Sequence, residues 1–130
     1  MLVTPFIAAL LALMYVFLSL WVIRFRFGER ISHGDGDNRD LRVAIRIHAN
    51  FIEYVPIALL LMWFIETALF DRGFAFVLGA ILVVSRIMHV IGMHNPRKFM
   101  ILRQLGVIAT LSVLIAASVR ILWFYLPIQL

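Results

Sequence analysis

The chain divides into four apolar stretches separated by short polar segments. Each stretch is about as long as the 20 or so residues that a helix needs to cross a bilayer. The segments between them carry turn-forming residues, such as the Gly and Asp residues of 34–38 and the sequence HNP at 94–96. This pattern predicts an all-α integral membrane protein in which residues 1–130 form a single domain, a bundle of four transmembrane helices. The predicted spans are residues 2–23, 44–70, 74–93 and 105–127.

Composition favours this prediction over a soluble domain. Of the 130 residues, 64% are hydrophobic and 15% are charged, whereas soluble domains are about half apolar and a quarter charged. The first basic residue, Arg24, follows the first apolar stretch. A cleaved signal peptide has the opposite order and a shorter apolar core, so the stretch is interpreted as a span.

The distribution of basic residues predicts the orientation in the membrane. The net charge is +5, but the basic residues lie among apolar spans and not on a polar, aromatic-rich surface, so nucleic acid is not an expected partner. Lysine and arginine concentrate in and beside the first and third connecting segments, while the second has only Arg72. The positive-inside rule therefore places loops 24–43 and 94–104 in the cytoplasm and both termini on the opposite side.

The chain contains no cysteine. It therefore offers no disulfide, no thiolate metal site and no cysteine nucleophile, so any thiol chemistry would have to come from a ligand. Asp and Gly alternate at 34–37, but the spacing and closing glutamate of a calcium loop are missing, and no metal site is expected. The absence of cysteine suits a bacterial inner membrane.

Polar residues inside the apolar spans are the strongest indication of a functional site, because ionisable groups in hydrocarbon are costly and usually face a bundle interior or a ligand. Since consecutive spans are antiparallel, these residues are predicted to lie together in the cytoplasmic half. They come from the start of the second span, the end of the third and the approach to the fourth: Arg42, Arg46, His48, Asn50, Glu53, Arg86, His89 and Arg103.

Helical geometry places most of the second-span residues on one face. Successive residues of a helix are about 100° apart around its axis. An arc of about 80° on this helix therefore contains Arg42, Arg46, Asn50 and Glu53. His48 lies outside this arc and points away from it. Two polar faces on one helix suggest a site between the subunits of an oligomer. The excess of arginine over the single glutamate predicts an anionic or zwitterionic small molecule, with an apolar second substrate arriving from the bilayer.

Two motifs resemble signatures of the MAPEG family, the membrane-associated proteins in eicosanoid and glutathione metabolism. One is the pattern R-x-H-x-N-x-x-E-Y-x-P at residues 46–56, which resembles the second-helix signature, and the other is SRIMHVIG at 85–92, which resembles the third-helix signature. The resemblance covers nearly the whole chain. It implies a four-helix homotrimer, similar to microsomal glutathione transferases, with glutathione bound as cosubstrate between neighbouring subunits.

The resemblance also implies roles for individual residues. Arg103 corresponds to a fourth-helix arginine that would stabilise the glutathione thiolate, which would then add to a lipophilic electrophile as in a glutathione S-transferase or peroxidase. Met93 stands where many family members have a tyrosine. Either Arg26 or Arg24 corresponds to a first-helix arginine, and Arg26 is assigned to the site. The positions implied to bind glutathione are Arg26, Arg46, His48, Asn50, Glu53, Tyr54, Arg86 and His89.

Simpler interpretations of the same residues remain open. Glu53 with Arg46 or Arg86 is also consistent with a structural ion pair. Glu66 is expected to lie toward the other end of the bundle and to pair with Arg72, and Arg120 is expected to reach the interface or to pair across helices.

Two other functions also remain open. His48 and His89 are consistent with a haem-binding electron carrier, although a histidine pair explains neither Asn50 nor Glu53. Met93 keeps open a non-catalytic MAPEG-like accessory or lipid-binding subunit of a larger membrane complex.

Overall fold

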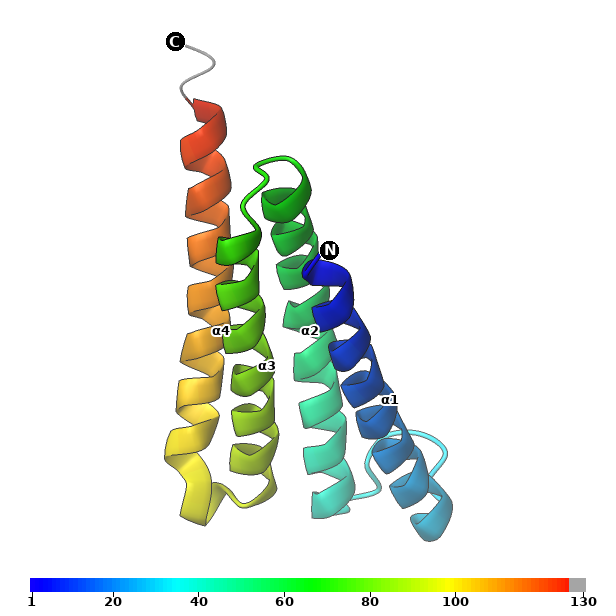
Figure 1. Ribbon diagram of the computed structural model, residues 1–130. Coiled ribbons are helices and arrows are strands. Elements are labelled where there is room, and N and C mark those ends of the chain that lie inside the picture. Colours follow the sequence, from blue (N-terminus) through cyan, green and yellow to red (C-terminus); the bar gives the residue numbers. More distant parts are fainter. Residues whose placement is uncertain (127–130) are drawn as a thin grey trace.

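The computed structural model describes residues 1–126, and over that range it consists of four helices joined by short connections (Figure 1). All four are long and apolar enough to cross a membrane, so the prediction of an all-helical, four-span protein is confirmed. The predicted end of the fourth span, residue 127, lies outside the described residues. The helices are α1 (Thr4–Glu29), α2 (Arg39–Thr67), α3 (Arg72–His94) and α4 (Pro96–Tyr125).

Side-chain caps determine where three of the helices begin. The side chains of Asn38, Asp71 and Asn95 accept hydrogen bonds from backbone amides in the first turns of α2, α3 and α4, which otherwise lack partners. Because Pro96 follows Asn95 directly and suits the first turn of a helix, α4 begins well before the predicted residue 105. Its apolar part starts at Met100, just after non-helical backbone at Phe99.

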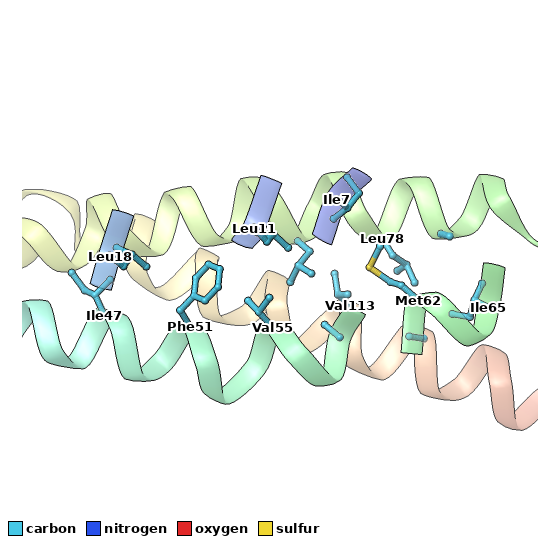
Figure 2. Packing of buried hydrophobic residues seen from close by; sticks show 14 residues of the cluster. Ile7, Leu11, Leu18, Ile47, Phe51, Val55, Met62, Ile65, Leu78 and Val113 are labelled. Atoms are coloured by element: carbon cyan, nitrogen blue, oxygen red, sulfur yellow. The ribbon is translucent and has the colours of Figure 1, made fainter. Parts of the chain in front are cut away.

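The core lies where α2 packs against its neighbours. α1 contacts α2 and α3, and α4 contacts α3 and α2, whereas α1 and α4 do not meet within residues 1–126. Figure 2 shows buried side chains of this core, which come from all four helices: Leu11 and Leu18 of α1, Phe51 and Val55 of α2, Leu78 of α3 and Val113 of α4. Many large apolar side chains remain exposed on all four helices, as expected for surfaces that contact lipid.

The end of the bundle with the α2–α3 connection is held by two acidic residues. The carboxylate of Glu66 accepts hydrogen bonds from the backbone amides of Val3 and Thr4 and so caps α1, which has no cap from its own N-cap side chain. Glu66 was expected to pair with Arg72; Arg72 is near enough to act on the carboxylate electrostatically, but the two form no ion pair, and the partners of Glu66 are these amides. Asp71 caps α3 and also pairs with Arg120 of α4 at 3.1 Å. This confirms the expectation that Arg120 pairs across helices.

Two arginines organise the loop between α1 and α2. Arg26 donates hydrogen bonds to three backbone carbonyls in residues 31–34, of which the shortest is 3.0 Å, to Gly34. Arg42 pairs with Asp35 and Asp37, and the hydrogen bond from Arg42 lowers the pKa of the Asp35 carboxyl below its ordinary value. The aspartates of this loop therefore neutralise an arginine.

Candidate functional site

The centre of the site is Arg86, a buried arginine where α2, α3 and α4 meet. Its side chain is 2% exposed. Nη1 donates to Oδ1 of Asn50 at 2.7 Å, while Nη2 donates to the hydroxyl of Thr110 and to the carbonyl of Gly106. No carboxylate within residues 1–126 forms an ion pair with this guanidinium. The cation is hydrogen-bonded but not neutralised, and this favours binding of an anion nearby.

Asn50 connects this buried charge to the surface of the bundle. Its Oδ1 accepts from Arg86 and lies 3.1 Å from Nε2 of His89. Because a guanidinium can only donate, the oxygen of the amide must face Arg86 and the Nδ2 group must point elsewhere. Asn50 is half-buried, and Nδ2 makes no hydrogen bond with the described part of the chain. It is therefore a donor available to a ligand.

His89 lies one turn after Arg86 on α3 and is 5% exposed. Since Oδ1 of Asn50 can only accept, Nε2 of His89 carries the proton in this hydrogen bond. Nδ1 of His89 and Nε of Arg86 are buried without hydrogen-bond partners among residues 1–126. Buried polar atoms without partners are uncommon in folded proteins and mark this cluster as chemically incomplete.

Two glycines bring α3 and α4 close together beside this cluster. A Cβ atom added to Gly92 would overlap the backbone of Arg103, and one added to Gly106 would lie 2.7 Å from the carbonyl oxygen of Ser85 and 2.8 Å from the amide nitrogen of His89. Arg103 is thereby held against α3, one turn from His89, and its charge acts on that side chain. The arrangement places a second arginine, besides Arg86, at the edge of the site.

The face of α2 beside Asn50 is open in the single chain. Arg46 and Glu53, one turn before and one turn after Asn50, are exposed, and neither forms an ion pair or side-chain hydrogen bond with residues 1–126. Tyr54 is half-buried and close enough to Arg86 to interact with it electrostatically. Arg46, Asn50, Glu53 and Tyr54 therefore form a polar face of α2 beside the buried Arg86. This face offers hydrogen-bond donors, a carboxylate and a phenol to a ligand.

Comparison with known proteins assigns the fold to a family. The profile of the MAPEG family matches residues 4–123. The chain belongs to the MAPEG family. The protein named "Inner membrane protein YecN" in Escherichia coli strain K12 is 36% identical over 128 residues, which cover 98% of this chain and 95% of that protein. The protein of the same name in Escherichia coli O6:H1 strain CFT073 is similar to the same extent. Together with the four apolar helices, this supports an integral inner membrane protein.

The structure brings four polar residues of the two MAPEG-like motifs together. Asn50, Tyr54, Arg86 and His89 lie in one cluster, with Arg103 at its edge. Arg46 and Glu53 share the exposed face described above.

Two of the predicted binding residues lie apart from this cluster. His48 lies between α1 and α2, with Nε2 3.1 Å from the hydroxyl of Ser19 and its ring stacked on Tyr15. Arg26 binds carbonyls of its own loop.

Three residues that contribute to the cluster around Arg86 were assigned no role from the sequence, although Ser85 lies within the third-span motif. Thr110 and Gly106 accept hydrogen bonds from Arg86, and Ser85 bonds to Thr110 at 2.9 Å. Gly106 and Thr110 are one turn apart on α4 and follow Arg103 at helical spacing. A search for small and polar residues on the face of the fourth span that carries Arg103 would have found both.

Met93 occupies the position that departs from the MAPEG pattern. It is half-buried and packs against the hydrophobic core. A thioether cannot donate a hydrogen bond, so Met93 adds packing to this end of α3 and no donor to the site.

Proposed function

We propose that this MAPEG protein is a glutathione-dependent membrane transferase or peroxidase, and that it acts as a homotrimer with glutathione bound between subunits. The observation that carries the proposal is the buried, unneutralised Arg86, linked through Asn50 to an exposed face with Arg46 and Glu53. Glutathione has two carboxylates, one ammonium group and a thiol. Its charges match the cations and the single carboxylate of this face.

The binding roles follow from which groups are exposed. Arg46 and the Nδ2 group of Asn50 are positioned to donate to carboxylates, and Glu53 to accept from the ammonium group. Arg86 is too deeply buried for direct contact in the single chain. It acts as a positioning residue that fixes the orientation of Asn50 and contributes positive potential from behind.

The exposure of Glu53 supports an oligomer. Glu53 lies near the middle of a helix that spans the membrane, yet its side chain is exposed in the single chain. A carboxylate at that depth facing lipid is costly, so a neighbouring subunit and a polar ligand that cover it would stabilise the assembly.

Catalysis would begin with activation of the thiol. A free thiol has a pKa of about 8.5 and reacts mainly as the thiolate. The guanidinium of Arg103 at the edge of the cluster favours the anion, and the thiol proton leaves to solvent. The thiolate sulfur then forms a bond to a lipophilic electrophile held in the bilayer, whose leaving group departs with the bonding electrons. With a hydroperoxide, the thiolate sulfur bonds to the terminal oxygen, the O–O bond breaks, and the alkoxide leaves and takes up a proton to become the alcohol. The thiol of a second glutathione then displaces water from the resulting sulfenic acid, which gives the disulfide.

A glutathione titration of the purified trimer or monomer in detergent tests the proposal. The ultraviolet difference spectrum reports thiolate formation. We expect a thiolate signal in the parent protein and its loss in Arg103→Ala, with binding retained. Arg97→Ala is the matched control, because Arg97 is an exposed arginine in the first turn of the same helix. A signal of equal size in both variants, or no binding by the parent, would contradict the proposal.

The proposed topology places loops 24–43 and 94–104 in the cytoplasm and both termini on the other side. The two basic connections lie at the same end of the bundle, opposite the α2–α3 connection (Figure 1). Because the chain has no cysteine, the single-cysteine variants Ser32→Cys and Gly73→Cys test this directly. An impermeant thiol reagent added to spheroplasts should label Gly73→Cys and spare Ser32→Cys; the reverse pattern would invert the topology.

Met93 favours a second candidate, a non-catalytic accessory or lipid-binding subunit of a larger membrane complex. The family resemblance implies a tyrosine at this position in many MAPEG members, and an apolar thioether packed against the core gives the site one donor fewer. If Met93 limits activity, Met93→Tyr should increase the thiolate signal or turnover. Stoichiometric copurification with other membrane proteins, together with no turnover in either variant, would favour the accessory role.

A further inference from the structure

A groove between α1 and α3 lies at the end of the bundle that carries the α1–α2 and α3–α4 connections. Near the N-terminus of α1 the two helices are in close contact, since a Cβ atom on Gly79 would lie 2.8 Å from Ile7. Toward the other end α1 diverges from α3 (Figure 1). The space between them there is a hollow of about 610 Å³, within the range of about 300–1,000 Å³ that is typical of small-molecule sites.

The walls of this groove are apolar and its mouth is cationic. Phe17 and Leu20 of α1 face Val90 and Ile91 of α3, and Phe99 at the start of α4 closes one side. The mouth carries Arg24 and His94. Phe17 and Arg24 are seven residues apart on one helix, so the polarity changes over about 10 Å along the direction that crosses the membrane.

A second hollow of about 540 Å³ adjoins the mouth and extends the cationic surface. It shares Trp21, His94 and Asn95 with the groove and is lined in addition by Arg39 and Arg97, with Asp40 as its acidic member. Positive side chains therefore outnumber negative ones around the opening. This surface lies where the first span meets its basic connecting segment, at the level of lipid headgroups.

We propose that the groove binds one anionic phospholipid from the surrounding leaflet, with an acyl chain along Phe17 and Leu20 and the phosphate at Arg24, His94 and Arg97. Apolar walls and a cationic mouth match the two ends of such a lipid, and zwitterionic lipids would bind less well because they carry no net charge. The groove is lined by none of the residues that carry the proposed glutathione site, which are Arg46, Asn50, Glu53, Arg86 and Arg103.

Trp21 is a reporter inside the groove, since its side chain lines both hollows. The protein with Trp63→Phe and Trp123→Phe retains Trp21 as its only tryptophan. This variant is reconstituted into two kinds of vesicle: phosphatidylcholine with dibromo-phosphatidylglycerol, and phosphatidylglycerol with dibromo-phosphatidylcholine. Quenching of Trp21 fluorescence is then compared at equal fractions of brominated lipid. Brominated lipid quenches only tryptophans that it contacts.

We expect brominated phosphatidylglycerol to quench Trp21 at lower mole fractions than brominated phosphatidylcholine, by about fivefold for each arginine that contacts the headgroup. Arg24→Gln with Arg97→Gln should remove the preference, and high salt should reduce it. Arg72→Gln, at the other end of the bundle, is the matched control. A protein with Trp123 alone should show no preference.

Three results would overturn the proposal. Equal quenching of Trp21 by the two lipids would show a groove without headgroup selectivity. A preference that survives the double arginine change would place the anion elsewhere. No quenching of Trp21 by either lipid would show that protein, such as a second copy of the chain, covers the groove.

Discussion

Asn50 on α2 accepts a hydrogen bond from Arg86 on α3, with 2.7 Å between Oδ1 and Nη1. This bond joins two helices within the membrane and fixes the orientation of the Asn50 amide. A hydrogen bond to a charged group in this setting typically contributes about 1.5–3 kcal/mol. It also leaves the positive charge of Arg86 without a neutralising partner, because an amide carries no charge, so the potential of Arg86 can act on a ligand bound outside the core.

Replacing Asn50 by aspartate separates stability from ligand binding. Asn50→Asp keeps the shape and supplies a carboxylate to Arg86, so the fold should be retained or stabilised while the affinity for glutathione falls by about tenfold or more. Thermal unfolding and glutathione titration measure the two effects. Asn38→Asp is the matched control, because Asn38 caps α2 and aspartate caps equally well. Because Asn50→Asp also removes the Nδ2 donor, unchanged affinity would exclude both that donor and the positive potential of Arg86 from glutathione binding.

Close packing of α3 and α4 depends on Gly106. Gly106→Ala should lower the free energy of unfolding by about 1–3 kcal/mol, because the added methyl group would meet backbone atoms of Ser85 and His89 that cannot move independently. Gly73→Ala is the control, since nothing lies within 4 Å of its added Cβ and alanine is the better helix former by up to about 1 kcal/mol. If thermal denaturation shows that Gly106→Ala is as stable as Gly73→Ala, then α3 and α4 do not pack as closely at Gly106 as the structure indicates.

Glu66 controls the first turn of α1. Glu66→Gln has one acceptor oxygen for two backbone amides, so the stability of this turn should fall by about 1–2 kcal/mol. Hydrogen exchange at the amides of residues 3–7 should accelerate, while the centre of α1 stays protected. Glu29→Gln, an exposed glutamate at the other end of α1, serves as the control. Equal exchange rates in the two variants would mean that the cap does not act in the membrane.

Asp71 combines a helix cap with an ion pair, and the two roles separate by substitution. Asp71→Asn preserves the cap on Phe74 but removes the charge that pairs with Arg120. A double-mutant cycle with Arg120→Gln should give a coupling of about 0.5 kcal/mol, because both side chains are about one-third exposed. Asp71→Ala should lower the free energy of unfolding by about 1 kcal/mol more than Asp71→Asn does, because alanine also removes the helix cap. A coupling near zero would show that the pair is fully screened.

The number and order of the helices could be predicted from the sequence because each span is a long apolar run bounded by turn residues. Helix ends could not be predicted as well. Asn95 and Pro96 start α4 ahead of its apolar part, and hydropathy does not detect a cap. Glu66 was assigned to the correct end of the bundle, but its partners are backbone amides, which no charge-pairing argument considers.

The site was predictable where helical spacing and the family motif agreed. Asn50, Arg86 and His89 meet because polar groups at one depth of antiparallel helices have only each other as partners. Thr110 was missed because burying a threonine in an apolar span costs little free energy, so its presence there does not by itself indicate a functional site. His48 was correctly placed on a different face, and its contact with Ser19 could not have been inferred without knowing how α1 packs on α2.

The cap that Glu66 provides also has a consequence for biogenesis. The amide of Thr4 and its acceptor are 62 positions apart in the chain, so the beginning of α1 is translated long before its partner exists. Until then those amides need water or lipid headgroups, because hydrocarbon offers no acceptor. The first turn of α1 therefore gains this cap only after α2 has been synthesised as far as Glu66 and has packed beside it.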